Sequence, residues 1–306
     1  MLNKIIIGTR GSKLSLAYAN KVKNLISKTD LTVAKKIKIE KIKTSGDVFQ
    51  NKKISEIGGK NLFCKEIEDK LISKEIDIAV HSLKDLDSVE TDGLVIQAYI
   101  KRNDPRDTLV SSKFKKLSEL NGQKIGSSSR RRELQLKQFN RNIKVESIRG
   151  NVDTRIKKIE NGEYDGAILA LAGLKVLNLE KYVKEIFSLK DFLPTAGQGI
   201  VAVQCRAQDD HIKKILREIN HKETETCALA ERSFLKTLGG DCDTAVGCTA
   251  ILNKNSIELK AQLFSDDGTK VFNLTKTGKE NEPELLGKLA GEEILKQSGK
   301  NFIKKR

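Results

Sequence analysis

The sequence predicts an α/β fold built from parallel strand–helix units and followed by a small α+β domain. Two observations support this prediction. Short apolar runs alternate with amphipathic stretches as far as about His221, and the pattern then changes to one long helical stretch, three strand-like stretches and a closing helix. The length of 306 residues corresponds to two domains at about 150 residues each, with three possible.

The first part of the chain carries the strand–helix alternation. Its strands are short apolar runs, and its helices place apolar residues at helical spacing. Two helix starts have capping signals: Asn61 follows the turn at Gly58-Gly59, and Ser127-Ser128-Ser129 precedes an arginine-rich helix. In chain order we predict strand 4–9, helix 14–26, strand 37–42, helix 61–73, strands 76–80, 94–100, 109–111 and 124–126, helix 131–140, strand 143–148, helix 152–160, strand 167–171 and a helix from Leu174.

The last part of the chain predicts the α+β domain. A helix over 223–238 ends at Gly239-Gly240, and strands follow at 245–252, 256–264 and 270–274 before a helix at 282–297. The turn residues 265–268 join the last two strands as a hairpin. Two of the three prolines, Pro105 and Pro194, stand where we expect the chain to cross between segments.

The net charge of +16 suggests an anionic partner, and the arginines locate it better than the lysines do. Of the 57 basic residues only 13 are arginine, and the lysines spread along the whole chain. Arginine is the side chain suited to bidentate recognition of carboxylate or phosphate. Six arginines nevertheless fall within 26 residues: Arg130, Arg131, Arg132, Arg141, Arg149 and Arg155. We interpret this cluster as the functional signal and the lysines as background.

Several classes of protein are disfavoured by composition. No apolar run approaches the roughly 20 residues of a membrane span, and the run at Ile5-Ile6-Ile7 is too short for a signal peptide. The five cysteines are scattered and do not form a disulfide framework. Neither a metal-binding spacing nor a Gly-rich nucleotide loop occurs, and the lack of Trp argues against stacking on single-stranded nucleic acid. We therefore expect a cytoplasmic protein without metal, membrane or nucleic-acid partner.

The first candidate site follows the strand at 76–80. Asp85 could act as a general acid or stabilise a developing cation, and Lys84 beside it could hold an anion. The carboxyl ends of strands in open α/β sheets face ligands, which favours this position. A salt bridge within a loop is the alternative. His81 alone is more typical of a packed histidine than of a catalyst.

The second candidate site combines serine hydroxyls, backbone amides at a helix start, and guanidinium groups. Ser127-Ser128-Ser129 precedes Arg130-Arg131-Arg132, and Arg149-Gly150-Asn151 with Arg155 repeats the arrangement. Such groups suit a carboxylate or a phosphate. Adjacent arginines on a helix cannot all face one ligand, so we expect two of the three to do so. The alternative is a solvated basic face.

Cys242 is the third candidate. It stands between Asp241 and Asp243 after a glycine pair, whereas Cys205 and Cys227 lie inside apolar runs. The two aspartates raise the pKa expected for its thiol and weaken it as a nucleophile. A single covalent attachment tolerates this better than repeated catalysis does.

Taken together, these segments resemble the hydroxymethylbilane synthase family, also called porphobilinogen deaminases. The resemblance runs nearly from end to end. It rests on these motifs in order: Gly8-Thr9-Arg10-Gly11-Ser12, Thr44-Ser45-Gly46-Asp47, Gly58-Gly59-Lys60 with Leu62-Phe63, Asp77-Ile78-Ala79-Val80-His81-Ser82-Leu83-Lys84-Asp85, Asp104-Pro105-Arg106-Asp107, Gly126-Ser127-Ser128-Ser129 with Arg131-Arg132, Arg149-Gly150-Asn151-Val152 with Thr154-Arg155, Asn161-Gly162-Glu163-Tyr164-Asp165, Ala172-Gly173-Leu174-Lys175, Gly197-Gln198-Gly199 and Cys242.

The resemblance implies three domains. Two α/β domains similar to periplasmic binding proteins enclose a hinged cleft, and a small C-terminal α+β domain carries Cys242. We place the boundaries at 1–100 with 195–219 for the first domain, 101–194 for the second and 220–306 for the third.

The resemblance also implies the chemistry. Members of the family condense four porphobilinogen molecules head to tail on a covalently bound dipyrromethane, lose ammonia, and release hydroxymethylbilane by hydrolysis. Cys242 would carry the dipyrromethane through a thioether, Asp85 matches the catalytic aspartate, and Lys60 lies on the loop over the cleft. The cofactor-binding positions are Lys84, Asp85, Ser128, Arg131 and Arg132, and the substrate-binding positions are Arg10, Ser12, Ser129, Arg149 and Arg155.

Two other functions compete with this interpretation. A non-catalytic two-domain protein that binds a small polycarboxylate would need the same cationic groups. A nucleic-acid-binding protein is suggested by the net charge alone. The resemblance favours the enzyme, with porphobilinogen as its partner and a monomer as its state.

Overall fold

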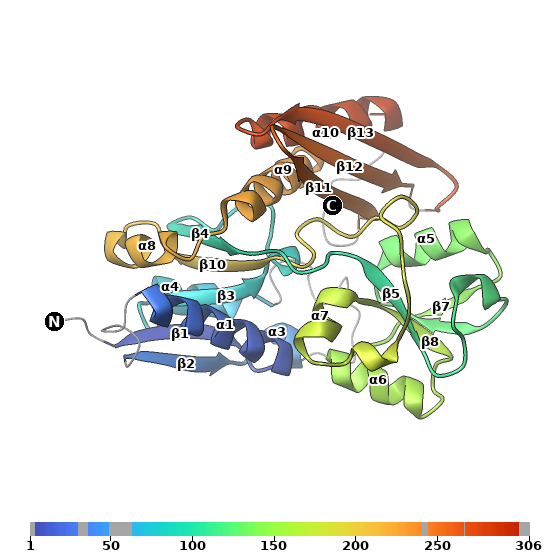
Figure 1. The fold of residues 1–306 in the computed structure, drawn as a ribbon, viewed down its shortest axis with the longest axis horizontal. Helices are drawn as coiled ribbons and strands as arrows, with labels where there is room; N and C mark the ends of the chain where they lie inside the picture. Colours follow the sequence, from blue (N-terminus) through green and yellow to red (C-terminus); the bar gives the residue numbers. More distant parts are fainter. Residues whose placement is uncertain (1–3, 30–35, 49–62, 240–243, 266, 300–306) are drawn as a thin grey trace. The chain divides into compact units, whose positions relative to one another are not determined.

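The computed structural model describes residues 4–29, 36–48, 63–239, 244–265 and 267–299 (Figure 1). Lys60, Asn61 and Cys242, which the sequence singled out, lie outside these described residues.

The first sheet has the strand order β2-β1-β3-β10-β4. Strands β1, β2 and β3 run parallel, and β10 runs antiparallel to both β3 and β4. The strands of this sheet are β1 (Ile5–Arg10), β2 (Ile37–Ile42), β3 (Ile78–Ser82), β4 (Leu94–Ile100) and β10 (Val201–Arg206), and the helices are α1 (Lys13–Thr29), α3 (Ser45–Val48), α4 (Lys65–Ile72), α8 (Asp210–Arg217) and the 3-10 turn η2 (Leu83–Asp85).

The second sheet repeats this topology with the order β7-β6-β8-β5-β9. Strands β6, β7 and β8 are parallel, and β5 lies antiparallel between β8 and the edge strand β9. Its elements are β5 (Asp107–Ser111), β6 (Lys124–Gly126), β7 (Lys144–Glu146), β8 (Gly166–Ala170), β9 (Val183–Ile186), α5 (Arg130–Phe139), α6 (Val152–Glu160), α7 (Leu171–Val176) and the 3-10 turns η3 (Leu117–Glu119) and η4 (Glu180–Tyr182).

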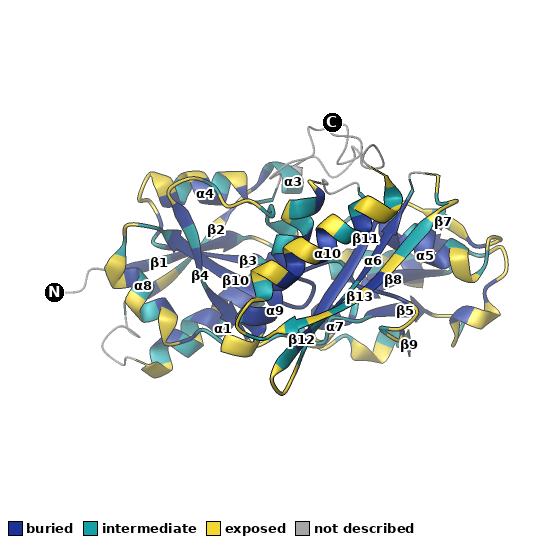
Figure 2. Ribbon diagram, turned by 90° about the horizontal axis from the view of Figure 1, so that it is seen from above, coloured by how far each residue is buried: buried dark blue, intermediate teal, exposed yellow. Residues whose placement is uncertain are grey.

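The third sheet is antiparallel, in the order β11-β12-β13. Strands β11 (Val246–Asn253), β12 (Ser256–Phe264) and β13 (Val271–Lys279) follow helix α9 (Lys222–Leu238), and helix α10 (Pro283–Ser298) closes the chain. Helix α10 buries one stripe and exposes the rest (Figure 2). This matches the small α+β domain that the sequence predicted.

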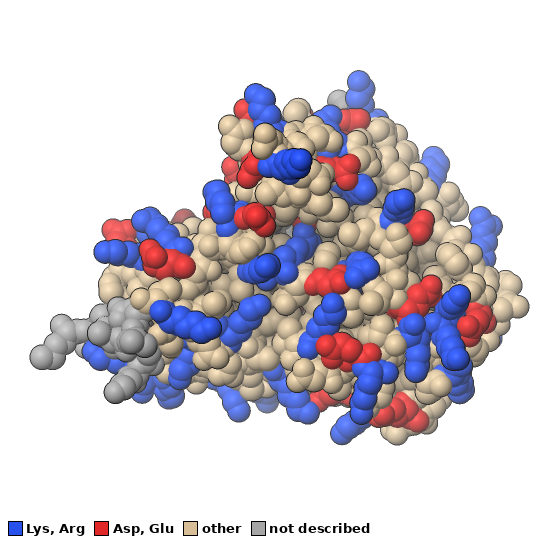
Figure 3. Space-filling view, in the orientation of Figure 1, with Lys and Arg blue, Asp and Glu red and all other residues tan. Residues whose placement is uncertain are grey.

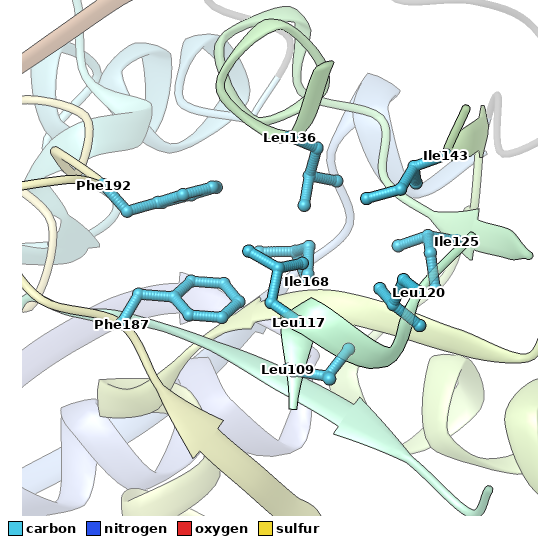
Figure 4. Packing of buried hydrophobic residues seen from close by; sticks show 9 residues of the cluster. All are labelled: Leu109, Leu117, Leu120, Ile125, Leu136, Ile143, Ile168, Phe187 and Phe192. Carbon is cyan, nitrogen blue, oxygen red and sulfur yellow. The ribbon is translucent and has the colours of Figure 1, made fainter. Parts of the chain in front are cut away.

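Apolar clusters beside the first two sheets fix the strands that carry the candidate site. In the first sheet, Leu83 is buried with Ile96, Tyr99 and Ile200. In the second, nine buried residues form one cluster that includes Leu109 and Ile168, and Phe187 contacts Phe192 with ring centroids 4.7 Å apart (Figure 4). Burial of this apolar surface holds the strand ends in place.

The expected α/β fold with two similar sheets and a small C-terminal domain is confirmed. The chain divides into two compact units, Met1–Asn103 with Gly199–Ala228, and Asp104–Gln198 with Leu229–Arg306. The third sheet belongs to the second of these units. The finer division into 1–100 with 195–219, 101–194 and 220–306 stays a prediction.

Several element boundaries differ from the prediction for physical reasons. Strand β13 extends to Lys279 instead of ending at 274, because it pairs with β12 as far as Lys279, although its last residues form no apolar run. Strand β9 was not predicted, and its four residues also form an exposed edge. Helix α7 begins at Leu171, within the predicted strand, because the chain turns directly from β8 into the helix.

Candidate active site

The carboxyl edge of the first sheet brings together three predicted segments. Arg10 is the last residue of β1, Thr44 follows β2, and Lys84 and Asp85 lie in η2 directly after β3. Because these three strands are parallel, their carboxyl ends meet at one edge. The sequence analysis named each segment as a motif, and the strand order explains why they are neighbours.

Arg10 is held in place by an acid and an aromatic ring. Its Nη2 lies 2.5 Å from Asp47 Oδ1, and the Asp47 carboxylate also accepts a 2.8 Å hydrogen bond from Thr44 Oγ1. The guanidinium lies 4.2 Å from the centroid of the Phe63 ring. Burial alone raises the pKa of Asp47, but the hydrogen bonds and charge of Arg10 hold this pKa below its ordinary value.

Asp85 is a second acid at this edge, and its contacts differ from those of Asp47. Its side chain is half-buried, and no hydrogen bond or ion pair engages its carboxylate among the described residues. Its backbone is fixed, because the Cys64 thiol donates to the Asp85 carbonyl oxygen at 3.2 Å and Leu83 is buried. Burial, together with the charge of Asp85, raises the pKa of Cys64, so this thiol stays protonated and remains a donor. Lys84 is exposed beside it.

His81 is buried in β3, as expected for a packed histidine. Burial lowers its pKa to about 4, because the interior disfavours the imidazolium ion. Its Nε2 has no hydrogen-bond partner within the described chain. The ring is therefore neutral near pH 7.

The carboxyl edge of the second sheet brings together the serines and arginines of the second candidate site. Ser127-Ser128-Ser129 follows β6, and Arg149 follows β7 by three residues. Ser129 caps α5 by accepting a 3.4 Å hydrogen bond from the Arg132 backbone amide. Since β6 and β7 are parallel neighbours, both segments reach the same edge.

Arg131 and Arg132 meet at one buried carboxylate, that of Asp107. Arg131 Nη1 lies 2.9 Å from Asp107 Oδ2, and Arg132 Nη2 lies 2.6 Å from Asp107 Oδ1. Gln198 Nε2 donates to the same Oδ1 at 2.9 Å. Burial raises the pKa of Asp107, but the charges of Arg132 and Arg131 outweigh it and hold this pKa well below its usual range. Burial also lowers the pKa of Arg131 to about 10.

Arg130 points elsewhere and pairs with Glu133 at 2.7 Å, with its side chain 38% exposed. Two of the three adjacent arginines thus contact one carboxylate, that of Asp107, and the expectation that two of them face one ligand stays a prediction.

The other predicted positions occupy the same two edges. Ser12 precedes α1, and its Oγ accepts a 3.1 Å hydrogen bond from the Ser15 backbone amide. Ser128 Oγ donates to the Ile148 carbonyl at 2.7 Å. Arg155 Nε donates to the Gly150 carbonyl at 2.8 Å, and Arg149 is half-buried.

Three residues of these edges were missed by the sequence analysis: Asp47, Cys64 and Asp107. Asp47 and Asp107 stood in recognised motifs, but nothing in the sequence tied them to particular arginines. The signal for Asp107 was topological, because it begins β5, an antiparallel strand whose start lies opposite the carboxyl end of β8.

Within the described residues, two other kinds of site are absent. No group of three or more His, Cys, Asp or Glu side chains there could hold a metal ion. No helix in that part of the chain is long and apolar enough to cross a membrane. On the face shown in Figure 3, Lys and Arg are scattered among Asp and Glu.

The fold and the site define a class of protein with two similar α/β sheets whose carboxyl edges present guanidinium groups and an available carboxylate. Residues 5–214 match the family model described as "Porphobilinogen deaminase, dipyromethane cofactor binding domain", and residues 225–296 match "Porphobilinogen deaminase, C-terminal domain". The chain belongs to the porphobilinogen deaminase family.

Individual relatives agree with this assignment. The chain is 38% identical over 298 residues to a porphobilinogen deaminase of Nitrobacter winogradskyi, covering 97% of this chain and 94% of the relative. It is 42% identical over 264 residues to one of Ehrlichia chaffeensis, covering 86% and 88%. Among solved structures, a TRAP periplasmic solute binding protein of Desulfovibrio salexigens aligns with a TM-score of 0.43 and 11% identity over 71% of this chain and 72% of that chain.

The expectation of a deaminating transferase of tetrapyrrole biosynthesis is confirmed, and so is its dipyrromethane cofactor. The alternative of a non-catalytic polycarboxylate-binding protein is not favoured. The roles of individual residues stay predictions.

Proposed function

We propose that Asp85 is the catalytic acid with which this chain condenses four porphobilinogen molecules head to tail and releases hydroxymethylbilane. The observation that carries this proposal is the availability of Asp85 at the carboxyl edge of the first sheet. Its carboxylate has no partner among the described residues, whereas Asp47 at the same edge is committed to Arg10.

The chemistry of deamination explains why a carboxyl group is needed. The departing amine leaves positive charge on the substrate pyrrole, and a fixed carboxylate nearby stabilises that charge. A carboxyl group can also transfer a proton as ammonia leaves. The hydrogen bond from Cys64 to the Asp85 backbone keeps this group in position without occupying its side-chain oxygens.

The residues of the second sheet fit a ligand that carries carboxylates. Arg131 and Arg132 each have a buried Nε–H without an acceptor in the described chain, and a carboxylate oxygen is the acceptor that guanidinium prefers. When bound, the dipyrromethane supplies the pyrrole end to which substrate units are added. The dipyrromethane would be bound by Lys84, Asp85, Ser128, Arg131 and Arg132, with Cys242 as the covalent anchor.

The substrate's acetate and propionate groups require cations of their own. Arg10, Ser12, Ser129, Arg149 and Arg155 would bind them. Arg10 is supported in this role by Asp47 and Phe63, which fix its guanidinium plane. Lys60 would lie on the loop over the site. We further propose that the protein is a cytoplasmic monomer without a nucleic-acid or membrane partner.

The test replaces Asp85 by Asn and compares it with Asp87→Asn, which removes a carboxylate two residues further along. Asp85→Asn should keep its dipyrromethane, as seen by intact mass, and lose turnover by about 10²–10⁴-fold. Asp87→Asn should keep both the dipyrromethane and normal turnover. Normal turnover in Asp85→Asn would remove Asp85 from the mechanism.

A further inference from the structure

Asp107, to which the proposed mechanism gives no role, stands at the centre of a buried cluster that includes Arg131 and Arg132. Its side chain is fully buried, and Arg131 and Arg132 are 3% and 7% exposed. Further neutral acceptors complete the cluster: the Gln135 side chain and the Leu193 carbonyl bind Arg131 at 2.9 and 2.7 Å, and the Ile168 carbonyl binds Arg132 at 3.0 Å.

The charges of this cluster do not balance. Within the described residues, two guanidinium groups share one carboxylate, and the other partners in the cluster are amide or carbonyl groups without charge. A buried charge is costly unless it is paired and hydrogen-bonded. The two unsatisfied Nε–H groups belong to the same side chains that carry the excess positive charge.

We propose that Asp107 is a positioning residue that fixes Arg131 and Arg132 in one orientation and leaves the pair with the charge for a single ligand carboxylate. This inference rests on the proposed function, in which both arginines hold the dipyrromethane. Without Asp107, two like charges would lie together with no shared acceptor. With a second acid, the pair would be neutral and would attract no anion.

Gln198 makes this charge count testable. Its Nε2 donates to Asp107 Oδ1 at 2.9 Å and to the Pro105 carbonyl at 2.7 Å. Its Oε1 accepts from Arg132 Nη2 at 3.3 Å. Gln198→Glu therefore keeps Asp107 in the sequence, removes the amide that donates to it, and places a second carboxylate beside the same guanidinium.

The experiment measures the fraction of purified protein that carries the dipyrromethane, by intact mass, together with circular dichroism and the thermal midpoint. Asp107→Asn and Gln198→Glu should each lower the loaded-to-unloaded ratio on the order of tenfold in folded protein, the size expected for one charge-assisted hydrogen bond. Asp104→Asn is the matched control, since it breaks the 2.7 Å pair with Arg106 in the same segment. The control should load like the wild type.

A second readout separates positioning from a general loss of structure. In the loaded fraction of Gln198→Glu, KM for porphobilinogen should stay within about twofold of the wild type, because the substrate is assigned to other residues. Should Asp107→Asn fail to fold, Gln198→Glu decides the question. Normal loading of folded Gln198→Glu would overturn the inference. A wild-type protein without the dipyrromethane would instead contradict the proposed function itself.

Discussion

The buried neutral state of His81 predicts a loss of stability in mild acid. The unfolded chain binds a proton at His81 with the ordinary pKa of 6.5, whereas burial lowers the pKa to about 4 in the folded protein. Between these values the unfolded state holds more protons, so the free energy of unfolding falls as the pH falls from 6.5 to 4. A difference of about 2.5 pKa units corresponds to about 3 kcal/mol.

The assay is urea unfolding at several pH values between about 7 and 4, for the wild type and for His81→Asn. The substitution also changes packing. The comparison is therefore between the pH dependence of the free energy of unfolding in the two proteins, and not between their absolute stabilities. Asp107 does not interfere, since its pKa is lowered in the folded protein and its contribution to stability is therefore lost mainly below the ordinary aspartate pKa of 3.8. Between about pH 7 and 4, the free energy of unfolding of the wild type should fall by up to about 3 kcal/mol more than that of His81→Asn.

His211→Asn provides the matched control, because His211 is an exposed histidine of α8. The free energy of unfolding of the His211→Asn variant should change with pH as that of the wild type does. Equal pH dependence of the free energy of unfolding in the wild type and in His81→Asn would contradict this prediction, because it would mean that His81 accepts a proton in the folded protein.

Three further substitutions test other contacts. Asp47→Asn should raise KM for porphobilinogen about tenfold, because Arg10 loses its charged partner, and steady-state kinetics would contradict this by showing an unchanged KM. Gly46→Ala should destabilise the protein by about 1–3 kcal/mol in urea unfolding, since its Cβ would overlap the Phe63 ring; equal midpoints would rule out that packing. Glu231→Gln should lower the free energy of unfolding by about 1–3 kcal/mol in the same assay, because the buried Glu231 carboxylate accepts hydrogen bonds of 2.6 and 2.7 Å from two backbone amides. Wild-type stability of this variant would show that the single oxygen of the glutamine amide is enough.

The sequence predicted those elements whose buried residues form a regular apolar pattern within the element itself. Strand β1 was recognisable as an apolar run, and helix α1 was recognisable as an amphipathic stretch. In each case the spacing of apolar side chains is enough to identify the element. Strand β9 was not recognisable, because an exposed edge strand is held by pairing with β5 and needs no apolar run. Strand β10 was not assigned either, although it lies fully paired between β3 and β4.

The candidate site shows a similar division. Residue types and strand-end positions pointed to Arg10, Asp85 and the arginine cluster. They did not show that Asp107 pairs with both Arg131 and Arg132, because that contact joins residues 24 and 25 positions apart through the antiparallel placement of β5. Contacts of this kind follow from topology, and only a structure supplies them.

The most direct test of the account is the intact mass of the purified protein before and after addition of porphobilinogen. The account predicts an added mass equal to two linked pyrrole units, absent from Cys242→Ser. It also predicts stepwise increases that each equal one porphobilinogen less ammonia. An unmodified polypeptide whose mass stays constant when porphobilinogen is added would contradict it.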